Sequence, residues 1–291
     1  MSLDVLPAAF SPTASETASF CMRKWGFYKA GYKPRVIQYP QICAFVGTGF
    51  AAGAAYINRG VQRGESPASN LATAVSIAQA EASLEAQQFI DAGATIAPKD
   101  EKTWDAMPHL IELAVTLFVK KYPHEGTIVE VEKSYPNFGY ARMDILYTRR
   151  ADNRLVVNDY KVKVKLQPQW VNKEIERYNR SHQLYEYMAM TGAAAYEITL
   201  IILAPEPKIK VISYEVDREF AMLWSHDTQM QWNRMAEMKH MTLAQLPGSL
   251  VHEDKWGPCP YSDACLRGRL DTADLALDYI KVERRTHDNA D

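Results

Sequence analysis

Cysteine is scarce in this sequence, with only four residues in a chain of 291. Small secreted domains that depend on disulfides carry far more cysteine for their length. A secreted disulfide framework is therefore excluded as the basis of the fold. The four thiols are expected to be either reduced side chains or metal ligands.

An excess of charge of either sign is also missing. Lysine and arginine total 33 against 35 aspartate and glutamate residues, which leaves a formal net charge of -2. The chain as a whole has no field that attracts nucleic acid, so any such contact requires a local cluster of basic side chains. The candidates for this cluster are Lys161, Lys163, Lys165, Arg177 and Arg180. A solvated charged face is the alternative interpretation of the same residues.

Three further sequence signals are missing. No uninterrupted apolar run reaches the length expected of a membrane span, and the first residues, MSLDVLPAAF, lack the basic segment of a signal peptide. Gly47-Thr48-Gly49 is not followed by the Gly-Lys-Ser/Thr of a phosphate loop, so unwinding of a duplex would require a partner. We expect a cytoplasmic protein without membrane contact.

The sequence does contain enough apolar residues for a large core. Hydrophobic residues make up 47% of the chain, which supports one large domain or a core with a helical annex. Helical spacing predominates in residues 1–125, strands and helices alternate in residues 126–245, and residues 246–291 contain a cysteine-bearing loop and a charged tail. The order helix, strand, hairpin, helix, strand predicts an α/β fold.

The most informative stretch is a predicted β-hairpin that turns at residues 150–153, between MDILYT and RLVVNDYKVKV. Asp144 lies on its first strand, and Asp159 and Lys161 share one face of the second. Two carboxylates at one point repel each other unless a cation lies between them, and a hard divalent ion fits there. A neighbouring lysine can stabilise charge on a phosphate or orient water, which predicts metal-assisted phosphodiester hydrolysis. The alternative is a surface hairpin with a solvated Asp144 and a salt bridge from Lys161.

A helical segment from Gln169 to Met190 follows the hairpin and places Gln183 and Tyr187 on one face. The order of Asp144, Asp159-Tyr160-Lys161 and Gln183-x3-Tyr187 resembles the PD-(D/E)XK nuclease superfamily, in particular its RecB-like branch. The resemblance implies a restriction-endonuclease-like α/β core, in which a central mixed sheet is flanked by helices. Residues 1–125 would form a helical N-terminal annex to this core.

The resemblance also implies a role for each matching residue. Asp144 and Asp159 are the implied ligands of Mg²⁺ or Mn²⁺, with the backbone carbonyl of Tyr160 as a further ligand. Lys161 is implied to assist hydrolysis. The implied nucleic-acid contacts, together with their basic neighbours, are Gln183, Tyr187, Lys163 and Arg180.

The sequence departs from the family at one metal ligand. Related proteins carry a Gly-Thr-x-x-His pattern in the N-terminal part, and its histidine binds the ion. Here Gly47-Thr48 is followed by Ala51, so either another group completes the site or metal binding is weakened. Glu81 and Glu85, one helical turn apart, could point inward, although solvent-exposed acids are the favoured interpretation.

The cysteines resemble those of iron–sulfur members of the same branch, in which one N-terminal cysteine joins a C-terminal Cys-x2-Cys-x5-Cys. Cys21, Cys259 and Cys265 match three of the four positions, and Trp256 occupies the remaining one. A cubane cluster normally takes four thiolates, and Cys43 lies where the pattern has no ligand. A cluster-free remnant is therefore favoured over a bound iron–sulfur cluster. In either case, the match predicts that the C-terminal loop folds back onto the N-terminal helix.

Together these residues predict a metal-dependent DNA nuclease, in particular an exonuclease that acts on ends or single strands. A helicase or a recombination and repair protein is an expected partner. The competing hypothesis is a catalytically weakened or inactive relative that binds nucleic acid or protein, because the histidine and one cysteine are missing. A small-molecule enzyme on an unrelated α/β fold is disfavoured, since no cofactor loop or nucleophile–base arrangement is visible.

Overall fold

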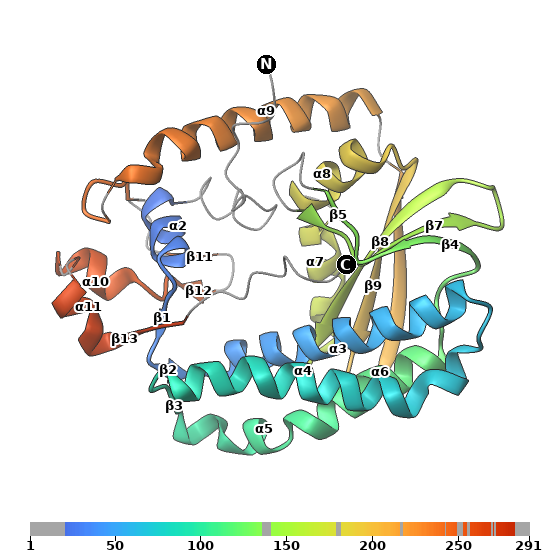
Figure 1. Cartoon of the computed structure of the whole chain (residues 1–291), viewed down its shortest axis with the longest axis horizontal. Helices are drawn as coiled ribbons and strands as arrows, with labels where there is room; N and C mark the ends of the chain where they lie inside the picture. Colours follow the sequence, from blue (N-terminus) through green and yellow to red (C-terminus); the bar gives the residue numbers. More distant parts are fainter. Residues whose placement is uncertain are drawn as a thin grey trace.

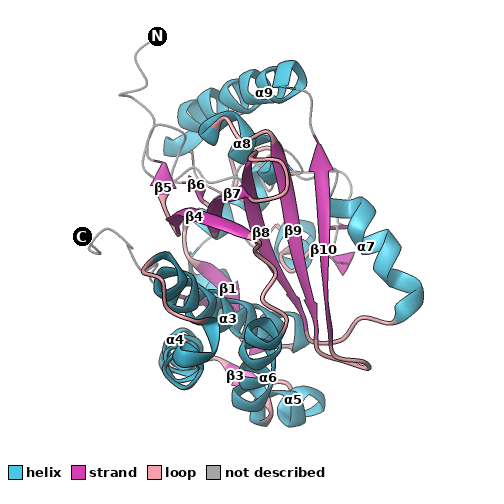
Figure 2. Ribbon diagram, turned by 90° about the vertical axis from the view of Figure 1, so that its right-hand side faces the viewer, coloured by secondary structure: helices cyan, strands magenta, loops and turns pink. Residues whose placement is uncertain are grey.

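A five-stranded mixed sheet forms the centre of the protein, with the strand order β10-β9-β8-β7-β4. The computed structural model describes residues 21–135, 141–178, 182–215, 218–241, 243–248, 253–254, 257–268, 270 and 272–282. The strands of the sheet are β4 (Gly126–Val131), β7 (Ile145–Arg149), β8 (Leu155–Lys163), β9 (Ala195–Ile202) and β10 (Lys208–Glu215). Helices cover both faces of the sheet, as the predicted α/β fold requires (Figures 1 and 2).

Strands β7 and β8 form the predicted hairpin. Their antiparallel pairing runs from Thr148 opposite Leu155 to Ile145 opposite Asn158. Asn153 has a φ of 55°, and asparagine is one of the few residues that adopt this left-handed conformation readily in turns. β8 and β9 are parallel, so the chain must cross over between them, and the crossover carries two helices. All eight residues of β9 are buried, as expected for a central strand covered on both faces.

One face of the sheet is covered by α3 (Tyr39–Gln62), which packs on α4 (Leu71–Asp91) and α6 (Met107–Lys120). A Cβ added at Gly49 of α3 would lie 2.5 Å from the carbonyl oxygen of Ala78, so glycine permits this close approach to α4. By length and composition alone α3 could cross a membrane, but half of its apolar window is buried within the fold. In this structure its apolar side chains belong to the core.

The opposite face is covered by α7 (Val171–Tyr178) and α8 (His182–Thr191), and α9 (Arg218–Glu237) packs on α8 (Figure 2). The predicted helix from Gln169 to Met190 is therefore built as α7 and α8, preceded by the 3-10 turn Pro168–Trp170. Apolar residues at helical spacing predict one helix from Trp104 to Lys121. The structure has α5 (Glu101–Asp105) and α6 there instead, because Pro108 occupies the first turn of α6.

The N-terminal and C-terminal parts of the described chain pack together beside this core (Figure 1). Strand β1 (Tyr32–Pro34) pairs with β13 (Tyr279–Lys281). Phe27 on α2 (Met22–Lys29) stacks on Tyr261 with 4.4 Å between ring centroids, and the Tyr261 hydroxyl donates to the Tyr32 carbonyl at 2.7 Å. Serine commonly caps helices, so the sequence predicts Ser19 as the cap of the first helix, but Ser19 lies outside the described residues. In the structure Cys21 caps α2 by accepting from the Lys24 N–H at 3.4 Å.

Short elements complete the described chain. They are β2 (Val36–Ile37), the 3-10 turn Pro67–Asn70, β3 (Thr95–Ile96), the 3-10 turn Pro98–Asp100, β5 (Ser134–Tyr135), β6 (Ala141–Arg142), the 3-10 turn Met238–His240, β11 (Glu253–Asp254), β12 (Gly257–Pro258), α10 (Ser262–Leu266) and α11 (Thr272–Asp278). Of these, β6 precedes the candidate site directly.

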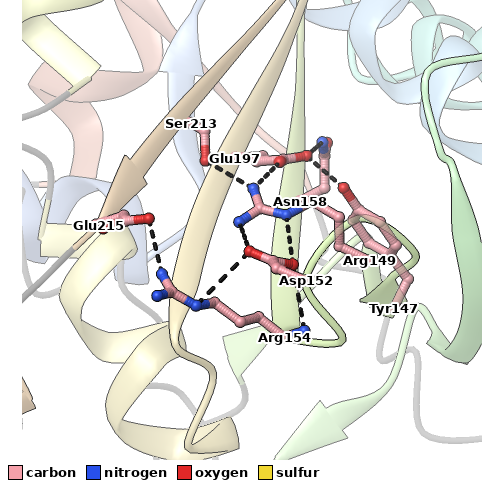
Figure 3. Close-up of polar contacts among 8 residues, drawn as sticks. All are labelled: Tyr147, Arg149, Asp152, Arg154, Asn158, Glu197, Ser213 and Glu215. Atoms are coloured by element: carbon pink, nitrogen blue, oxygen red, sulfur yellow. Dashed lines mark hydrogen bonds and ion pairs between the residues drawn. The ribbon is translucent and has the colours of Figure 1, made fainter.

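A buried carboxylate connects the strands near the hairpin turn (Figure 3). Glu197 on β9 accepts from the Tyr147 hydroxyl at 2.6 Å and from the Arg149 guanidinium at 3.1 Å. The Asn158 amide lies 3.4 Å from the same carboxylate. Since Glu197 is 4% exposed, its charge depends on these donors rather than on water.

Glu197→Gln is expected to lower the free energy of unfolding by ~1–3 kcal/mol. The NH₂ group of the new amide is a donor, so it cannot accept the hydrogen bonds that one carboxylate oxygen accepted. Urea denaturation followed by circular dichroism measures the change. Glu215→Gln is the matched control: Glu215 pairs with Arg154 at 2.7 Å, but its side chain is 69% exposed. The control should shift the free energy by less than about 0.5 kcal/mol. Equal effects of both variants would contradict a dependence on burial.

Candidate active site

The site lies where β7 and β8 separate. Their pairing ends at Ile145 opposite Asn158, although β8 continues to Lys163. Along an antiparallel ladder, the N–H and C=O groups of every second residue point toward the partner strand. The N–H and C=O of Tyr160 therefore point to the side of β8 on which β7 lies, but beyond the point where the two strands pair. The Asp144 carboxylate takes this position and accepts the Tyr160 N–H at 2.6 Å. A carboxylate is thus held against the backbone of the second acid-bearing strand.

The two predicted acids, Asp144 and Asp159, interact strongly. Burial and the neighbouring charge of Asp159 raise the pKa of Asp144 to about 7, although the charge of Lys161 and the Tyr160 N–H act in the opposite direction. Asp159 is itself 2% exposed. Asp144 is half-buried, and a carboxylate whose ionisation is disfavoured by a neighbouring carboxylate is suited to sharing a cation with it.

Lys161 joins the second acid to α8. Its ammonium group lies 2.5 Å from Asp159 Oδ2 and donates to Gln183 Oε1 at 3.0 Å. Asp159 and Lys161 share a face of β8 because they are two residues apart in a strand, as the sequence predicts. The structure therefore brings together Asp144, Asp159 and Lys161, the three residues expected to carry the chemistry.

The predicted pair on α8, Gln183 and Tyr187, is held by hydrogen bonds within the protein. Gln183 donates from Nε2 to the Tyr187 hydroxyl at 2.9 Å, and this hydroxyl donates to the Arg142 carbonyl at 2.6 Å. Arg142 lies two residues before Asp144, so the connection runs from Lys161 to the strand that leads into the first acid. Tyr187 is 2% exposed and would have to move to touch a bound strand. In this structure it positions Gln183.

The predicted basic cluster is balanced by an acid on α7. Lys163 and Arg177 lie 2.5 Å and 2.7 Å from the same oxygen of Glu174. Burial lowers the pKa of Lys163, while the Glu174 carboxylate raises it. The ammonium groups of Lys161 and Lys163 and the guanidinium of Arg177 also lie within 6.0 Å of the centre of the Tyr178 ring. Arg180 lies outside the described residues.

The donor set of the site fits a hard divalent ion that keeps several waters. Asp159 Oδ2 is buried and, among the described residues, has no hydrogen-bond partner besides its ion pair with Lys161. The Asp144 carboxylate and the Tyr160 carbonyl supply further oxygen atoms, and Mg²⁺ commonly takes only one or two carboxylates from a protein. Across the described chain, no three His, Cys, Asp or Glu side chains converge on one point. Among the described residues, the charged groups that the protein offers a cation here are thus these two carboxylates.

The residues that the sequence suggests for a third metal ligand lie on helices α3 and α4, not on the sheet. Ala51 is a half-buried residue of α3, where its methyl group offers no ligand atom. Glu81 and Glu85 lie on α4, whose main packing partners are α3 and α6 rather than the sheet. Both glutamates are half-buried rather than exposed, because their helix is covered by these neighbours.

The three predicted cysteines gather where the C-terminal segment meets α2. The charge of Cys21 contributes to raising the pKa of both Cys259 and Cys265, although burial is the larger cause for each. Within the described residues these thiols do not form a group that could hold a metal, and Trp256 lies outside them. The residues described thus do not fit an iron–sulfur cluster. Cys43 lies apart from these three, on α3.

Sequence reasoning missed a buried polar group behind the site. Asn58, Tyr122 and His124 surround the side chain of Tyr160, which points to the opposite face of β8 from Asp159. These three residues come from α3 and from the segment between α6 and β4. Their only local signal was a polar side chain within or beside an apolar stretch, which does not identify a partner.

The geometry defines a class of protein: an α/β fold whose central hairpin presents an acid, a second acid and a lysine at the end of two diverging strands. A family model described as the PD-(D/E)XK nuclease superfamily matches residues 9–266. The chain belongs to this superfamily, whose members are typically nucleases that use divalent metals such as Mg²⁺ or Mn²⁺.

Other comparisons add little to this assignment. A solved structure described as "Crystal structure of SSO0001" is similar at 17% sequence identity, with a TM-score of 0.25. The similarity covers 62% of this chain and 74% of that chain. No curated protein matches the sequence.

Proposed function

We propose that the protein is a Mg²⁺- or Mn²⁺-dependent DNA nuclease of the RecB-like branch, and that it removes nucleotides from ends or single strands. The observation that carries the proposal is the meeting of Asp144, Asp159 and Lys161 at the point where β7 and β8 separate. Burial and the charge of Asp159 raise the pKa of Asp144, and the lysine is held at 2.5 Å from Asp159. The Gln183-x3-Tyr187 helix beside them supports the assignment to this branch.

Each residue has a defined task in the proposed hydrolysis. Asp144, Asp159 and the Tyr160 carbonyl hold the ion, which when bound supplies Lewis-acid polarisation and a water of lowered pKa. Lys161 lies beside the acids, where an ammonium group stabilises negative charge that develops on phosphate oxygens. Gln183 fixes the direction of Lys161 through its 3.0 Å hydrogen bond. Tyr187 in turn holds Gln183.

Contact with the DNA strand is assigned to side chains that reach the surface around this site. Lys163 and Arg177 are 17% and 27% exposed and share one carboxylate, so together they retain positive charge. A phosphate can bind two cations that are already held in one place at a lower entropic cost than two mobile side chains. Because the whole chain carries a net charge of -2, a helicase or repair partner that delivers the strand belongs to the proposal.

A specific observation favours a second candidate function. Ala51 stands where the family pattern has a metal-binding histidine, and the described residues contain no three converging ligand side chains. A relative with weakened or lost catalysis, kept for binding nucleic acid or protein, would show these features. The proposed test must therefore measure binding and cleavage separately.

The test uses four substrates of one sequence. Single-stranded DNA, double-stranded DNA and single-stranded RNA are end-labelled, and circular single-stranded DNA carries an internal label. Each is incubated with the full chain in Mg²⁺, in Mn²⁺ and in EDTA. We expect short products from linear DNA in either metal and none in EDTA, because two carboxylates alone cannot activate water sufficiently. Resistance of the circle would show that an end is required.

The same samples decide between the two functions. Binding of DNA, measured by fluorescence anisotropy, without cleavage in either metal would favour the non-catalytic candidate. Cleavage of the circle at the same rate as the linear strand would contradict exonuclease action while retaining the nuclease. Preferential cleavage of RNA would replace DNA as the substrate.

A further inference from the structure

The Tyr160 hydroxyl is bound from two sides. The Asn58 amide donates to it at 2.8 Å, and His124 Nε2 lies 2.6 Å from it. The Tyr122 hydroxyl in turn donates to Asn58 Oδ1 at 2.8 Å. Asn58 is fully buried, and His124 is 7% exposed, so these bonds are made without competition from bulk water.

The direction of the hydrogen bonds can be worked out from the donors. Asn58 uses its oxygen to accept from Tyr122, so it presents its NH₂ group to Tyr160. The Tyr160 hydroxyl accepts this bond and has one proton left, which it donates to His124 Nε2. In this arrangement His124 is neutral and carries its proton on Nδ1, which has no hydrogen-bond partner among the described residues; in the other tautomer His124 Nε2 donates to the Tyr160 hydroxyl instead. Burial lowers the pKa of His124 to about 3, in agreement with a neutral ring.

Aromatic rings enclose the same hydroxyl-bearing ring. The centre of the Tyr160 ring lies 5.3 Å from that of Phe118 and 5.8 Å from that of Phe50, in edge-to-face contacts. These contacts come from α6 and α3, the helices that cover this face. The ring and its hydroxyl are thus both fixed, one by packing and the other by directed hydrogen bonds.

This fixed side chain belongs to the residue whose backbone serves the site. Tyr160 donates its N–H to Asp144 at 2.6 Å, on the edge of β8 where pairing with β7 has ended. On its other edge β8 stays paired with β9 as far as Lys163, so the side-chain contacts of Tyr160 act in addition to that ladder. A shift of that strand would move the N–H, the carbonyl and the neighbouring Asp159 together.

We propose that Asn58 and His124 are positioning residues of the candidate active site, which act by holding the Tyr160 hydroxyl and thereby set where its peptide groups meet Asp144. The inference rests on the proposed function, because it concerns the ability of the same site to hold a divalent ion. Neither residue touches the ion or a substrate. Partners that orient ligand-bearing groups commonly change metal affinity by ~10–100-fold.

The test measures Mn²⁺ binding to the full chain by isothermal titration calorimetry, after removal of metal with a chelator, so that it does not depend on cleavage. His124→Phe keeps a ring among its aromatic neighbours but removes the acceptor for Tyr160. We expect its Kd for Mn²⁺ to rise about 10-fold. His124→Gln, which restores an acceptor, should return the Kd to within about 3-fold of the wild-type value.

Tyr160→Phe provides a second approach, in case the histidine variants do not fold. It removes only the hydroxyl oxygen and should raise the Kd by a similar factor. Tyr147→Phe is the matched control: it also removes a buried tyrosine hydroxyl, the one that donates to Glu197 at 2.6 Å, from the same sheet. It should lower the urea midpoint as the other variants do, yet leave Mn²⁺ affinity unchanged.

The possible outcomes separate the inference from the function on which it rests. If Tyr160→Phe and Tyr147→Phe change the Kd equally, or neither changes it, the network serves stability alone and the inference is overturned. Loss of affinity in Tyr160→Phe alone supports it. If the wild-type chain binds no Mn²⁺, the proposed function is overturned as well, whatever the variants do.

Discussion

Asp159→Asn is expected to reduce metal-dependent cleavage of DNA by on the order of 10³-fold while leaving the protein folded. Asparagine has nearly the same volume as aspartate, so packing at this buried position changes little. The variant lacks the charge that we propose binds the ion, and that holds Lys161 at 2.5 Å. Initial rates on end-labelled DNA at saturating Mn²⁺, with circular dichroism as the check on folding, measure the effect.

Asp152→Asn is the matched control for this loss. Asp152 lies in the turn of the same hairpin and is bound by Arg149, at 2.5 Å, rather than by any residue of the site (Figure 3). The control should cleave at the wild-type rate. Full activity of Asp159→Asn would show that the cleavage has another source, either elsewhere in the chain or in a contaminant.

Asp144→Asn is expected to stabilise the metal-free protein at pH 8 while abolishing its stabilisation by metal. The pKa of Asp144 is raised from 3.8 to about 7 by burial and by the charge of Asp159, so the folded state disfavours the ionised carboxylate. Asparagine removes this penalty and still offers an oxygen to the Tyr160 N–H. The gain in unfolding free energy is on the order of 1–3 kcal/mol at pH 8.

The dependence on pH follows from the direction of the shift. Between pH 4 and pH 7 the folded chain retains a proton on Asp144 that the unfolded chain has lost, so the free energy of unfolding falls as pH rises. Above pH 7 both states are ionised and the penalty stays constant. The difference between Asp144→Asn and the wild type is thus largest above pH 7 and disappears near pH 4.

Urea denaturation in EDTA at pH 4, 6 and 8 measures this difference, and the series is then repeated with Mn²⁺. Mn²⁺ should stabilise the wild type by an amount that grows with the ratio of the Mn²⁺ concentration to the Kd. It should not stabilise the variant. A variant that is less stable than the wild type at pH 8 in EDTA would show that the Asp144 carboxylate is held by favourable interactions and not against repulsion.

The sequence was sufficient for the elements on which the site is built. Alternating β-branched and aromatic residues around a polar turn predicted β7 and β8, because this pattern reflects a local property of strands. The spacing of Asp159 and Lys161 then placed both on one face. The predominantly apolar stretch TGAAAYEITLIILAP predicts a buried strand for a similar reason, and β9 lies within it.

The parts that sequence reasoning missed depend on contacts between distant segments. Asn58 and Tyr160 are separated by 102 residues, and no periodicity connects a helix residue to one particular strand residue. Tyr187 was predicted to contact nucleic acid, but its burial depends on how α8 packs on the sheet. The contact between Lys163 and the acid on α7 is likewise set by tertiary packing.

The pairing of β1 with β13 has a consequence for the order of events during synthesis. The Tyr261 hydroxyl donates to the carbonyl of Tyr32, which lies 229 residues earlier in the chain. The ring of Tyr261 is also the one on which Phe27 of α2 stacks. At ribosomal rates of about 5–20 residues per second, the interval between the two segments is roughly 10–50 s. The sheet and its helices can assemble during this interval, whereas α2 has no surface for Phe27 until nearly the whole described chain has emerged. The first helix of the described chain is therefore among the last to dock.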